Sequence, residues 1–463
     1  MFGINKNLKL HFIGIGGIGM SGIAKVLMNL GYQVSGSDLS ESETVSKLKN
    51  NGAEVYIGHD SKNIKDVQIV VYSSAIDESN PEIIEARKQK IPLIKRAEML
   101  AELMRLKYGI AIAGSHGKTT TTSLLATILN KLEFKPTYII GGLVKNLEDN
   151  AQIGDGELLI AEADESDGSF LLLNPIMSVI TNIDNDHLDY YGNIENLQSA
   201  FVEFSNKVPF YGSVSLNAHD EFSVELIKNL KKPHIIYGIE GKKSFSDSID
   251  YKASNIEETI DGARFDVSFE GEKESFQIKL NGEHNILNAL GAVTIAHKIG
   301  ATLKDISNAI TNFEGVSRRQ EVIYSKEEFI IMDDYAHHPT EIVATIETVK
   351  KKYPKKKLVV CFEPHRYSRT QLFWKEFVES FDGVEEVHIS PICAASEEAI
   401  EYIDSEVMVK NIGDNNIKAH YIDSLEKMSD IFLDNLSQNT IVLTLGAGPI
   451  SRIARRIVDE KLS

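Results

Sequence analysis

Apolar and polar positions alternate along the first part of the chain in a way that predicts strands and helices in turn. Apolar stretches at residues 10–15 and 69–72 predict strands, and residues 33–37 are expected to form the strand between them in the chain. Residues 19–30 place apolar side chains at helical spacing, which predicts a helix between the first two strands. Strands that alternate with helices form parallel sheets, so this block predicts a doubly wound α/β domain.

A second block begins near residue 108 and carries a different pattern at its end. Residues 109–113 predict a short buried strand, a glycine-rich loop follows, and a helix is expected to reach about residue 132. Residues 158–161 and 176–181 predict two further strands of the buried type. Within residues 242–280, the segments 263–269 and 276–280 alternate apolar and polar side chains, which predicts added antiparallel strands. A helix at 286–299 ends the block.

The third block runs from about residue 315 to the end of the chain. Its apolar stretches predict parallel strands at 330–333, 358–362, 386–389 and 441–445, with helices between them. A chain of 463 residues is too long for one hydrophobic core. We therefore expect an α/β protein of three domains: a Rossmann-like N-terminal domain at 1–107, a P-loop-type central ATPase domain at 108–314 and a Rossmann-like C-terminal domain at 315–463.

Composition narrows the classes of partner. Hydrophobic residues make up 42% and charged residues 25%, which is ordinary for a globular protein. The net charge of −18 disfavours non-specific binding to nucleic acid or to an anionic membrane. Only two cysteines are present, so a reducing compartment is expected. No apolar stretch reaches the roughly 18 residues of a membrane span, and the first apolar segment is a strand rather than a signal peptide. We expect a cytoplasmic protein.

The loop after the strand at 109–113 has the chemistry of a triphosphate site. It reads Gly114-Ser115-His116-Gly117-Lys118-Thr119-Thr120 and opens a helix. Glycines let backbone amides approach phosphate oxygens, Lys118 can neutralise the outer phosphates, and a threonine hydroxyl can ligate Mg²⁺. The usual motif G-x-x-x-x-G-K-[ST] has two more residues between its glycines, and its first glycine falls here on Ile112. The alternative is a glycine-rich turn that binds nothing.

Acidic and imidazole side chains follow two of the central strands. Glu162 comes directly after the apolar run 158–161, and His187 follows 176–181. Open α/β sheets place ligands at the carboxyl ends of their strands, so both residues are candidates to hold Mg²⁺. Glu165 is a second candidate for the carboxylate. Asp184, Asp186 and Asp189 are expected to cap and solvate loops instead.

The N-terminal block carries a dinucleotide fingerprint. Gly14-x-Gly16-x-x-Gly19 follows the first strand, and Asp38 ends the second. The same geometry serves NAD or any other diphosphate, a nucleotide sugar included. A nicotinamide-dependent oxidoreductase and a non-catalytic nucleotide-binding switch therefore stand as alternatives to an ATP-dependent enzyme.

Several segments together resemble the Mur ligase family. The first is the loop Gly-Ser-His-Gly-Lys-Thr-Thr-Thr, which is similar to the family's ATP motif. The others follow in the family's order at Glu162-Ala-Asp-Glu165-Ser-Asp, Thr181-Asn-Ile-Asp-Asn-Asp-His187, Gly282-Glu-His284-Asn285-Ile-Leu-Asn288, Asp333-Asp-Tyr335-Ala-His337-His338-Pro339 and Pro364-His365-Arg366-Tyr-Ser-Arg369. At the N-terminus, Gly14-Ile-Gly16-Gly17-Ile-Gly19-Met-Ser-Gly and Lys95-Arg96-Ala-Glu98-Met resemble the member that adds the first amino acid. The resemblance covers nearly the whole chain.

The resemblance implies an ATP-dependent ligase of peptidoglycan precursor synthesis. It would join L-alanine to the carboxylate of UDP-N-acetylmuramate through an acyl phosphate, with ATP and Mg²⁺ as cofactors and ADP and phosphate as products. A relative that adds a preformed peptide to the same nucleotide sugar shares most motifs and stays an alternative. We expect a monomer or a homodimer.

The resemblance also implies roles for individual residues. ATP would contact Gly114, Ser115, His116, Gly117, Lys118, Thr119, Thr120, His284, Asn285, Asn288, Arg318, Arg319 and Asp334. The metal would be held by Thr119, Glu162 and His187, and catalysis would use Lys118, Glu162, His187 and Arg319. The nucleotide sugar would contact Gly16, Gly17, Ile18, Gly19, Met20, Asp38, Ser73, Ser74, Ala75 and Arg96. The amino acid would contact Tyr335, His337, His365, Arg366 and Arg369.

The chain departs from the family at two points. Gln320 stands where relatives usually carry an aromatic residue after the arginine pair. The helix expected at 195–206 offers no lysine before Lys207, so we expect no carbamylated lysine at the metal site.

Overall fold

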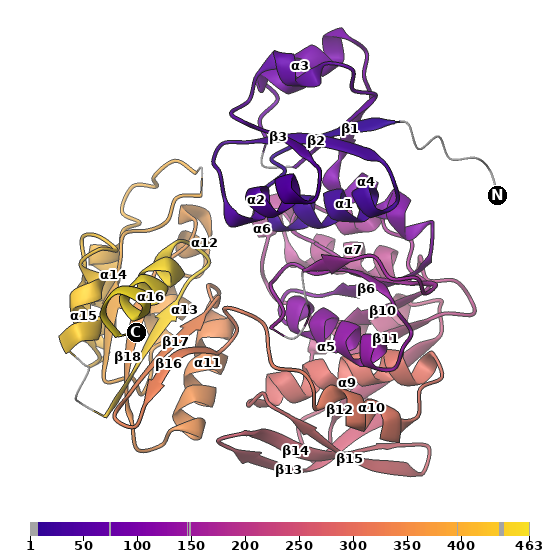
Figure 1. Ribbon diagram of the computed structural model, residues 1–463. Helices are drawn as coiled ribbons and strands as arrows, with labels where there is room; N and C mark the ends of the chain where they lie inside the picture. The colour runs from indigo at the N-terminus through magenta and orange to yellow at the C-terminus, as the bar shows by residue number, and fades with distance from the viewer. Residues whose placement is uncertain are drawn as a thin grey trace. The chain divides into compact units, whose positions relative to one another are not determined.

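The computed structural model describes residues 8–73, 76–145, 147, 150–395, 397–434 and 439–462. It contains three sheets, of five, ten and six strands, each built mainly from parallel pairs (Figure 1). The predicted α/β class with three sheet-containing domains is confirmed. By its internal contacts the chain forms two compact units, 1–255 with 265–277 and 287–314, and 256–264 with 278–286 and 315–463. The three predicted domain boundaries stay predictions.

The N-terminal sheet has the order β3-β2-β1-β4-β5 and is parallel throughout. Its strands are β1 Lys9–Ile13, β2 Gln33–Asp38, β3 Glu54–Ile57, β4 Ile69–Tyr72 and β5 Leu93–Lys95. Its helices are α1 Ile18–Asn29, α2 Glu43–Asn50, η1 Ser61–Ile64, α3 Pro81–Lys88 and α4 Arg96–Met104. Neighbouring residues of β1 serve opposite faces: Phe12 packs in the cluster with α1, and Ile13 packs with α3. This alternation explains why the strand carries apolar side chains on both of its faces.

The ten-stranded sheet has the order β15-β14-β13-β12-β11-β10-β6-β9-β7-β8. Its strands are β6 Tyr108–Ala113, β7 Thr137–Ile139, β8 Ala151–Gln152, β9 Leu158–Glu162, β10 Met177–Ile180, β11 Ser213–Asn217, β12 His234–Ile239, β13 Tyr251–Thr259, β14 Gly262–Phe269 and β15 Glu272–Ile278. Its helices are α5 Lys118–Lys131, η2 Ser169–Leu172, α6 Leu188–Tyr191, α7 Ile194–Ser205, α8 Glu221–Glu225, η3 Leu226–Asn229, α9 Glu283–Lys298 and α10 Leu303–Ile310. In Figure 1, α7 lies on one side of the sheet and α5 and α9 lie on the other.

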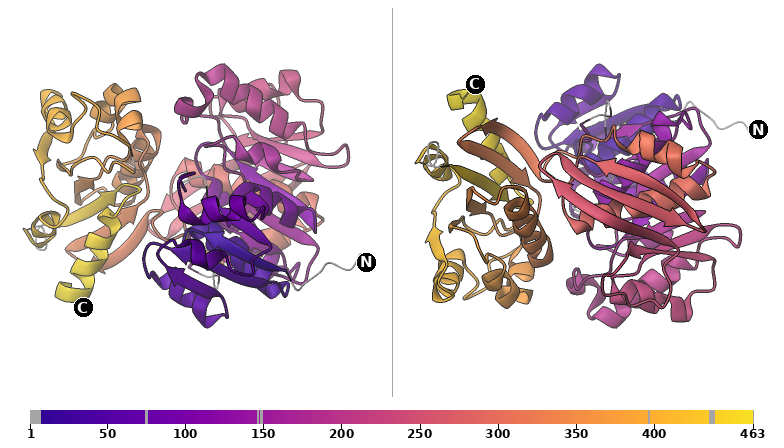
Figure 2. Two further views of the ribbon diagram at one scale, coloured as in Figure 1. Left: turned by 90° about the horizontal axis from the view of Figure 1, so that it is seen from above. Right: turned by 90° about the horizontal axis from the view of Figure 1, so that it is seen from below.

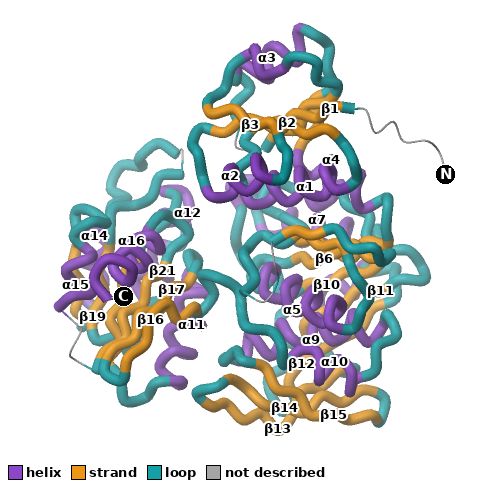
Figure 3. The backbone as a smooth tube through the Cα atoms, viewed as in Figure 1, coloured by secondary structure: helices purple, strands orange, loops and turns teal. Residues whose placement is uncertain are grey.

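The last three strands of this sheet form the predicted meander. β13, β14 and β15 are neighbours in the sheet and are joined by two-residue turns. In Figure 3 the segment consists of strand and turns, with no helix drawn in it. The alternating pattern therefore identified the segments 263–269 and 276–280 correctly, although β15 begins four residues earlier, at Glu272.

The C-terminal sheet has the order β16-β17-β21-β18-β19-β20, and only its edge pair β16–β17 is antiparallel. Its strands are β16 Glu321–Lys326, β17 Phe329–Asp334, β18 Lys357–Phe362, β19 Glu386–Ile389, β20 Lys418–Tyr421 and β21 Thr440–Leu445. Its helices are α11 Pro339–Lys352, α12 Tyr367–Leu372, α13 Trp374–Glu379, α14 Ser405–Asp414, α15 Met428–Asp434, α16 Ile450–Ile457 and the π-helical η4 Val458–Leu462. Figure 2 shows the C-terminal helix, in yellow, alongside this sheet.

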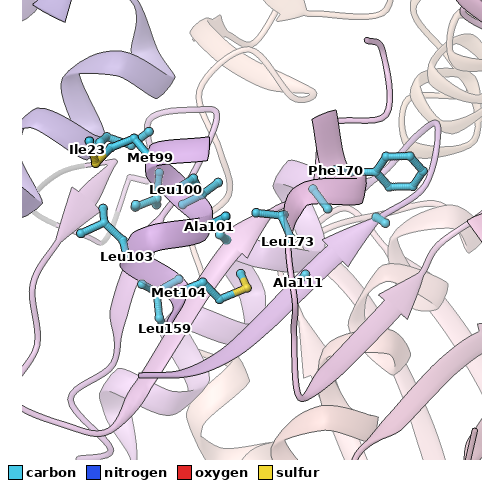
Figure 4. Packing of buried hydrophobic residues seen from close by; sticks show 14 of the residues in the cluster. Ile23, Met99, Leu100, Ala101, Leu103, Met104, Ala111, Leu159, Phe170 and Leu173 are labelled. Atoms are coloured by element: carbon cyan, nitrogen blue, oxygen red, sulfur yellow. The ribbon is translucent and has the colours of Figure 1, made fainter. Parts of the chain in front are cut away.

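A continuous apolar cluster joins the N-terminal sheet to the ten-stranded one. Met99, Leu100 and Leu103 on α4 pack in the same cluster as Ile23 on α1 and Leu159 on β9 (Figure 4). Burial of such side chains is worth about 1.5–3 kcal/mol each. The two sheets therefore form one compact unit, which agrees with the contact division of the chain.

Among the described residues, no helix is both long and apolar enough to cross a membrane.

Candidate active site

The predicted phosphate loop connects β6 to α5 at the carboxyl edge of the ten-stranded sheet. Gly114 and Gly117 have φ of +127° and +84°, values that side chains with a Cβ rarely adopt. Gly117 is the N-cap of α5, so the first amides of that 14-residue helix point out of the loop. The arrangement gives a phosphate both unpaired backbone donors and the positive end of a helix dipole.

The loop is fixed against the segment that follows β10. The backbone N–H of Ser115 donates to Asn182 O at 3.0 Å, and that of His116 donates to Asn182 Oδ1 at 2.9 Å. Thr181 Oγ1 donates to His116 O at 2.6 Å. The His116 Nε2 atom lies 3.0 Å from Asp184 Oδ2. Thr181 and Asn182 thus hold the loop backbone and Asp184 holds the His116 side chain, which is the preorganisation that anion binding needs.

Lys118 is held by a buried carboxylate. Its Nζ donates to both Glu165 oxygens at 2.8 Å and to Gly114 O at 2.5 Å. Burial raises the pKa of Glu165 to about 7, against the opposing charge of Lys118. Burial lowers the pKa of Lys118, but Glu165 and Asp164 outweigh it and raise the pKa overall. The lysine is therefore a cation aimed into the loop.

Glu162 and Thr119 lie together, as a shared metal ion requires. Thr119 Oγ1 is 3.0 Å from Glu162 Oε2, and the Gly141 amide donates to Glu162 Oε1 at 2.6 Å. An oxygen-only pair of one hydroxyl and one carboxylate beside a triphosphate loop fits Mg²⁺, which keeps several waters and phosphate oxygens as further ligands.

His187, a predicted metal ligand, lies close to Glu165. It occupies the N-cap position of α6 with φ of +61°, and its Nε2 lies 3.5 Å from Asp186 Oδ2 and 3.8 Å from Glu165 Oε1. The structure thus places Glu162 with Thr119, and Glu165 between Lys118 and His187. Whether His187 and Glu162 share a metal stays a prediction.

Three of the residues predicted to contact ATP, His284, Asn285 and Asn288, lie at the start of α9. Asn288 Oδ1 accepts from Thr121 Oγ1 at 3.3 Å, and a Cβ added to Gly117 would lie 2.3 Å from it. Asn288 therefore packs on the phosphate loop itself. Asn285 donates from its side chain to Asn281 O at 2.8 Å, which is a contact within its own turn rather than a cap of a later amide.

His284 is kept neutral by its surroundings. Burial, with the charge of Arg319, lowers the pKa of His284 to about 4. Gln320, which stands in the position where relatives carry an aromatic residue, lies 3.3 Å from the His284 Nε2 atom through its amide nitrogen. The departure from the family pattern thus brings a second hydrogen-bonding side chain to His284.

The N-terminal glycine loop is tied to the end of β2. The Gly16 amide donates to Asp38 Oδ2 at 2.9 Å, and a Cβ on Gly16 would lie 2.8 Å from the same oxygen. Gly17 is the N-cap of α1, and Ile18 is 47% exposed at its first turn. The loop therefore offers a helix N-terminus, which suits a diphosphate, beside a carboxylate, which suits the hydroxyls of a ribose.

The other residues predicted to contact the nucleotide sugar lie in different surroundings. Met20 is buried, and its Cγ lies 3.9 Å from where a Cβ on Gly17 would stand. Arg96 begins α4, its Cδ lies 3.3 Å from where a Cβ on Gly19 would stand, and its Nη2 donates to Asp164 Oδ2 at 3.0 Å. Ser73 follows β4 directly. Ser74 and Ala75 lie outside the described residues.

Three rings predicted for the amino-acid pocket follow one another in the C-terminal sheet. The Tyr335 and His337 rings are 5.2 Å apart, and the His337 and His365 rings are 6.2 Å apart. Burial and the charges of Arg369 and Arg366 lower the pKa of His365 to about 4. The structure therefore brings these predicted residues to the carboxyl edge of β17 and β18.

The two predicted arginines of this pocket differ in setting. Arg366 Nε donates to Glu397 Oε1 at 2.6 Å, and Arg369 is buried. Ser368 donates from its backbone and from its hydroxyl to the same carboxylate, at 2.9 and 2.6 Å. Glu397 therefore orients the turn that carries Arg366.

The paired arginines that begin the C-terminal part share one aromatic partner. The guanidinium groups of Arg318 and Arg319 lie 4.9 and 5.1 Å from the Tyr335 ring centroid. Arg318 also donates to the carbonyls of Gly446, Gly448 and Ala447 at 2.6, 3.2 and 3.4 Å. Arg318 thus secures the glycine segment after β21 as well.

Asp334 accepts from two backbone amides. Gln320 N and Ala336 N donate to its oxygens at 2.7 and 2.8 Å, and burial raises its pKa to about 6. These contacts fix the turn after β17 rather than expose the carboxylate.

Sequence reasoning missed the residues that hold the predicted ones. Asn182 and Asp184 support the phosphate loop, Tyr191 donates from its hydroxyl to Glu165 O at 2.6 Å, and Glu397 orients Arg366. Asp184 was interpreted as a solvated loop residue. The only signal for these roles was their position just after buried strands or within the same segments.

Comparison with protein families identifies the class. The chain matches the models described as Mur ligase family, catalytic domain, over residues 9–108; Mur ligase middle domain, over 112–296; and Mur ligase, glutamate ligase domain, over 318–448. The chain therefore belongs to the Mur ligase family and is a ligase. The resemblance seen in the sequence motifs is confirmed.

Individual relatives share one name. The chain is 45% identical to the UDP-N-acetylmuramate–L-alanine ligase of Endomicrobium trichonymphae over 446 residues, which covers 96% of this chain and 97% of the relative. It is 46% identical to the ligase of the same name from Brachyspira hyodysenteriae over 450 residues, which covers 96% of each. The solved structure of UDP-N-acetylmuramate-alanine ligase from Thermotoga maritima is similar with a TM-score of 0.83 and 29% identity, over 98% of this chain and 99% of that one.

A more distant structure shares the fold. A murein peptide ligase from Psychrobacter arcticus has a TM-score of 0.73 and 22% identity, over 98% of both chains.

Proposed function

We propose that the chain joins L-alanine to the lactyl carboxylate of UDP-N-acetylmuramate, with hydrolysis of ATP to ADP and phosphate. The relatives that share 45–46% identity over nearly the whole chain carry the name of that activity. The observation within the molecule that carries the proposal is the phosphate loop with Lys118 and the Thr119–Glu162 pair. We place the reaction in the cytoplasm, where both ATP and the nucleotide sugar are made.

The first step is phosphoryl transfer. A carboxylate oxygen of UDP-N-acetylmuramate attacks the γ-phosphorus of ATP, the bond to the β–γ bridging oxygen breaks, and an acyl phosphate and ADP result. The loop amides and Lys118 stabilise the charge that develops on the phosphate oxygens. Thr119 and Glu162 would hold Mg²⁺, with His187 as a further candidate ligand, and the ion supplies positive charge to the phosphate oxygens. Arg319 adds a cation from the C-terminal part.

The second step is acyl transfer. The amine of L-alanine attacks the acyl carbon, the amide bond forms, and phosphate leaves with the electron pair of the broken C–O bond. The alanine carboxylate needs a planar cationic partner, which Arg366 or Arg369 supplies as a bidentate fork. Tyr335, His337 and His365 border the same edge, and the pKa of His365, lowered to about 4, keeps that imidazole neutral beside the arginines.

The nucleotide sugar is assigned to the N-terminal glycine loop. Gly16, Gly17, Ile18 and Gly19 would contact the diphosphate, and Asp38 would contact the uridine ribose. Arg96 would add a cation at the edge of the same loop. The oxidoreductase alternative rested on this loop alone, and family membership favours the nucleotide sugar over NAD.

One assay tests the proposal directly. ADP release is measured with ATP, Mg²⁺ and UDP-N-acetylmuramate, against L-alanine, glycine, L-serine and a preformed tripeptide. L-Alanine is expected to support turnover best, and a preference for the tripeptide would assign the chain to the peptide-adding activity instead. Hydroxylamine in place of the amino acid should yield a hydroxamate that depends on the nucleotide sugar. Normal product formation without any hydroxamate would contradict the acyl phosphate.

A further inference from the structure

A fully buried carboxylate lies between the N-terminal sheet and helix α3, outside every contact assigned above. Glu82 is in the first turn of α3 and has no exposed surface. Ser37 Oγ donates to Glu82 Oε2 at 2.6 Å, and Asn63 Nδ2 donates to Glu82 Oε1 at 2.6 Å. The backbone N–H of Asp60 approaches Glu82 Oε1 at 3.4 Å. These donors satisfy the hydrogen-bonding capacity of the Glu82 carboxylate. It lies in a position where apolar side chains would normally pack.

Two histidines complete the surroundings of Glu82. His59 Nδ1 lies 3.4 Å and His11 Nε2 lies 3.6 Å from Glu82 Oε2. Burial raises the pKa of Glu82, but the nearby His11 imidazole and the hydrogen bonds from Ser37 and Asn63 outweigh it and lower the pKa overall. Glu82 is therefore an ionised group inside the domain. Replacing such a buried polar cluster by apolar residues is often neutral or stabilising, so core packing alone does not explain it.

The cluster gathers the ends of the strands at which ligands bind. Ser37 is in β2, His59 and Asp60 follow β3, and Asn63 is in η1. His59 Nδ1 also lies 2.9 Å from Ser37 Oγ. Glu82 thus connects the carboxyl ends of β2 and β3 to the N-terminus of α3. The carboxyl edge of a parallel sheet is where a Rossmann-like domain holds its nucleotide.

Ser37 links the buried cluster to the glycine loop. Its carbonyl accepts from Gly14 N at 2.8 Å and from Ile15 N at 3.0 Å, so it fixes the first residues of the loop. The next residue, Asp38, accepts from Gly16 N at 2.9 Å. The Gly58 amide donates to Asp38 O at 2.7 Å. The end of β2 is therefore hydrogen-bonded to Glu82 through the Ser37 hydroxyl and to the glycine loop through the Ser37 carbonyl and the Asp38 side chain.

We propose that Glu82 is a positioning residue for the nucleotide-sugar site, which acts through the Ser37 hydroxyl to fix the glycine loop and Asp38. The inference rests on the proposed function for the identity of the ligand. Glu82 does not touch the diphosphate or the ribose. It sets the backbone geometry that both of them meet, so its loss weakens binding of the nucleotide sugar and leaves the ATP and amino-acid sites intact.

Two variants test the link from its two ends. Glu82→Gln keeps the shape of the side chain and one acceptor, and Ser37→Ala removes the hydroxyl but leaves Glu82 in place. Each is expected to raise the KM for UDP-N-acetylmuramate about tenfold, the effect of one buried hydrogen bond of ordinary strength. The kcat and the KM values for ATP and L-alanine should stay within about twofold of the wild type. Because both variants break one link, the double variant should be no worse than the poorer single one.

A matched control separates positioning from stability. Ser35 is also buried in β2, and its hydroxyl lies 3.0 Å from His11 Nδ1 without contact to Glu82 or the loop. Ser35→Ala should lower the Tm as the test variants do but leave every KM unchanged. If Glu82→Gln fails to fold, Ser37→Ala and Asn63→Ala carry the comparison.

The outcomes distinguish the inference from the proposed function. If the wild type forms product and neither Ser37→Ala nor Glu82→Gln raises the KM for the nucleotide sugar above that of Ser35→Ala, the positioning role is overturned while the function stands. Equal rises in all three KM values would also overturn it, since a general loss of structure explains them. If the wild type forms no product from UDP-N-acetylmuramate, the proposed function fails, and the inference fails with it. Titration with UDP alone should show the same tenfold loss of affinity in the variants.

Discussion

Lys118 Nζ lies 2.8 Å from both carboxyl oxygens of Glu165, so the lysine of the phosphate loop is paired with a buried carboxyl group before any nucleotide binds. The same ammonium donates to two carbonyls of its own loop, Gly114 O and Ser115 O. A bound triphosphate must draw the Lys118 ammonium toward the outer phosphate oxygens. The nearby Glu165 carboxylate then helps to keep the lysine charged. The position of Lys118 is therefore fixed by residues of the loop and by Glu165, 47 positions away in the sequence.

Lys118→Met should remove most of the turnover. The loss of one preorganised charge at the transferred phosphate is expected to lower kcat about 10²–10³-fold, because the charge that develops in the transition state loses its partner. Steady-state ADP release with saturating substrates measures the effect. Lys131→Met, at the exposed far end of the same helix, is the matched control and should retain wild-type kcat. Equal activity in the two variants would contradict the role of Lys118.

The Mg²⁺ requirement should distinguish Glu162 from Glu165. Glu162 lies 3.0 Å from Thr119 Oγ1, whereas Glu165 contacts the lysine. Glu162→Gln removes a ligand charge and should raise the Mg²⁺ concentration for half-maximal activity by at least about tenfold. Glu165→Gln should lower kcat without a comparable shift in the Mg²⁺ titration. A large shift in Glu165→Gln and none in Glu162→Gln would exchange the two roles.

Much of the fold follows from local patterns because the strands are buried on both faces. β6, β9, β10 and β18 are apolar runs that end where glycine or polar residues begin. β1 ends at Ile13 rather than at the predicted residue 15 because Gly14 turns the chain with φ of +77°. β11, at Ser213–Asn217, was not predicted, since its serines and asparagine hide a strand that is buried at every position. Burial of polar residues is decided by neighbours in space, which a local pattern does not contain.

As with the fold, local patterns predicted one part of the candidate site and missed another. Lys118, Thr119 and Glu162 were predicted from a loop and a strand end, and the structure brings them together at one edge. The pairing of Lys118 with Glu165 depends on how β9 and α5 pack, so the motif alone left two glutamates open. The hold of Glu397 on Arg366 spans 31 positions and has no sequence signal of its own. Motifs thus predict the groups that meet ligands better than the groups that orient them.

Gly117→Ala should inactivate the loop by two separate effects. The φ of +84° costs roughly 1–2 kcal/mol for a residue with a Cβ, and that Cβ would stand 2.3 Å from Asn288 Oδ1. The clash should displace Asn288 and raise the KM for ATP at least about tenfold, which corresponds to about 1.4 kcal/mol. Kinetics with varied ATP measure the change.

Gly192→Ala is the matched control for backbone strain. Gly192 has φ of +78°, close to that of Gly117, but an added Cβ there meets nothing within 4 Å. It should lower the Tm by a similar amount and leave the KM for ATP unchanged. If both alanine variants raise the KM equally, contact with Asn288 has no part in nucleotide binding.

His284 should stay neutral through the physiological pH range and contribute a pH-dependent part of stability. Burial and Arg319 lower its folded pKa to about 4, below the ordinary value of 6.5. Between these values the folded state binds fewer protons than the unfolded state, so stability is complete above about pH 6.5 and falls as the pH drops toward 4. The imidazole is partly exposed, so we expect the loss to be about 2 kcal/mol rather than the full value for the shift.

NMR titration of the His284 imidazole measures the pKa directly, with the signal assigned by its absence in His284→Gln. No protonation step should occur above about pH 5. The Tm of His284→Gln should fall less than that of the wild type between pH 7 and pH 5, because Gln does not titrate. His234→Gln, at an exposed position, is the control and should retain the wild-type dependence. A His284 titration centred near pH 6.5 would show that Arg319 and burial do not act on the imidazole, and a neutral His284 could not then be assumed in its predicted contact with ATP.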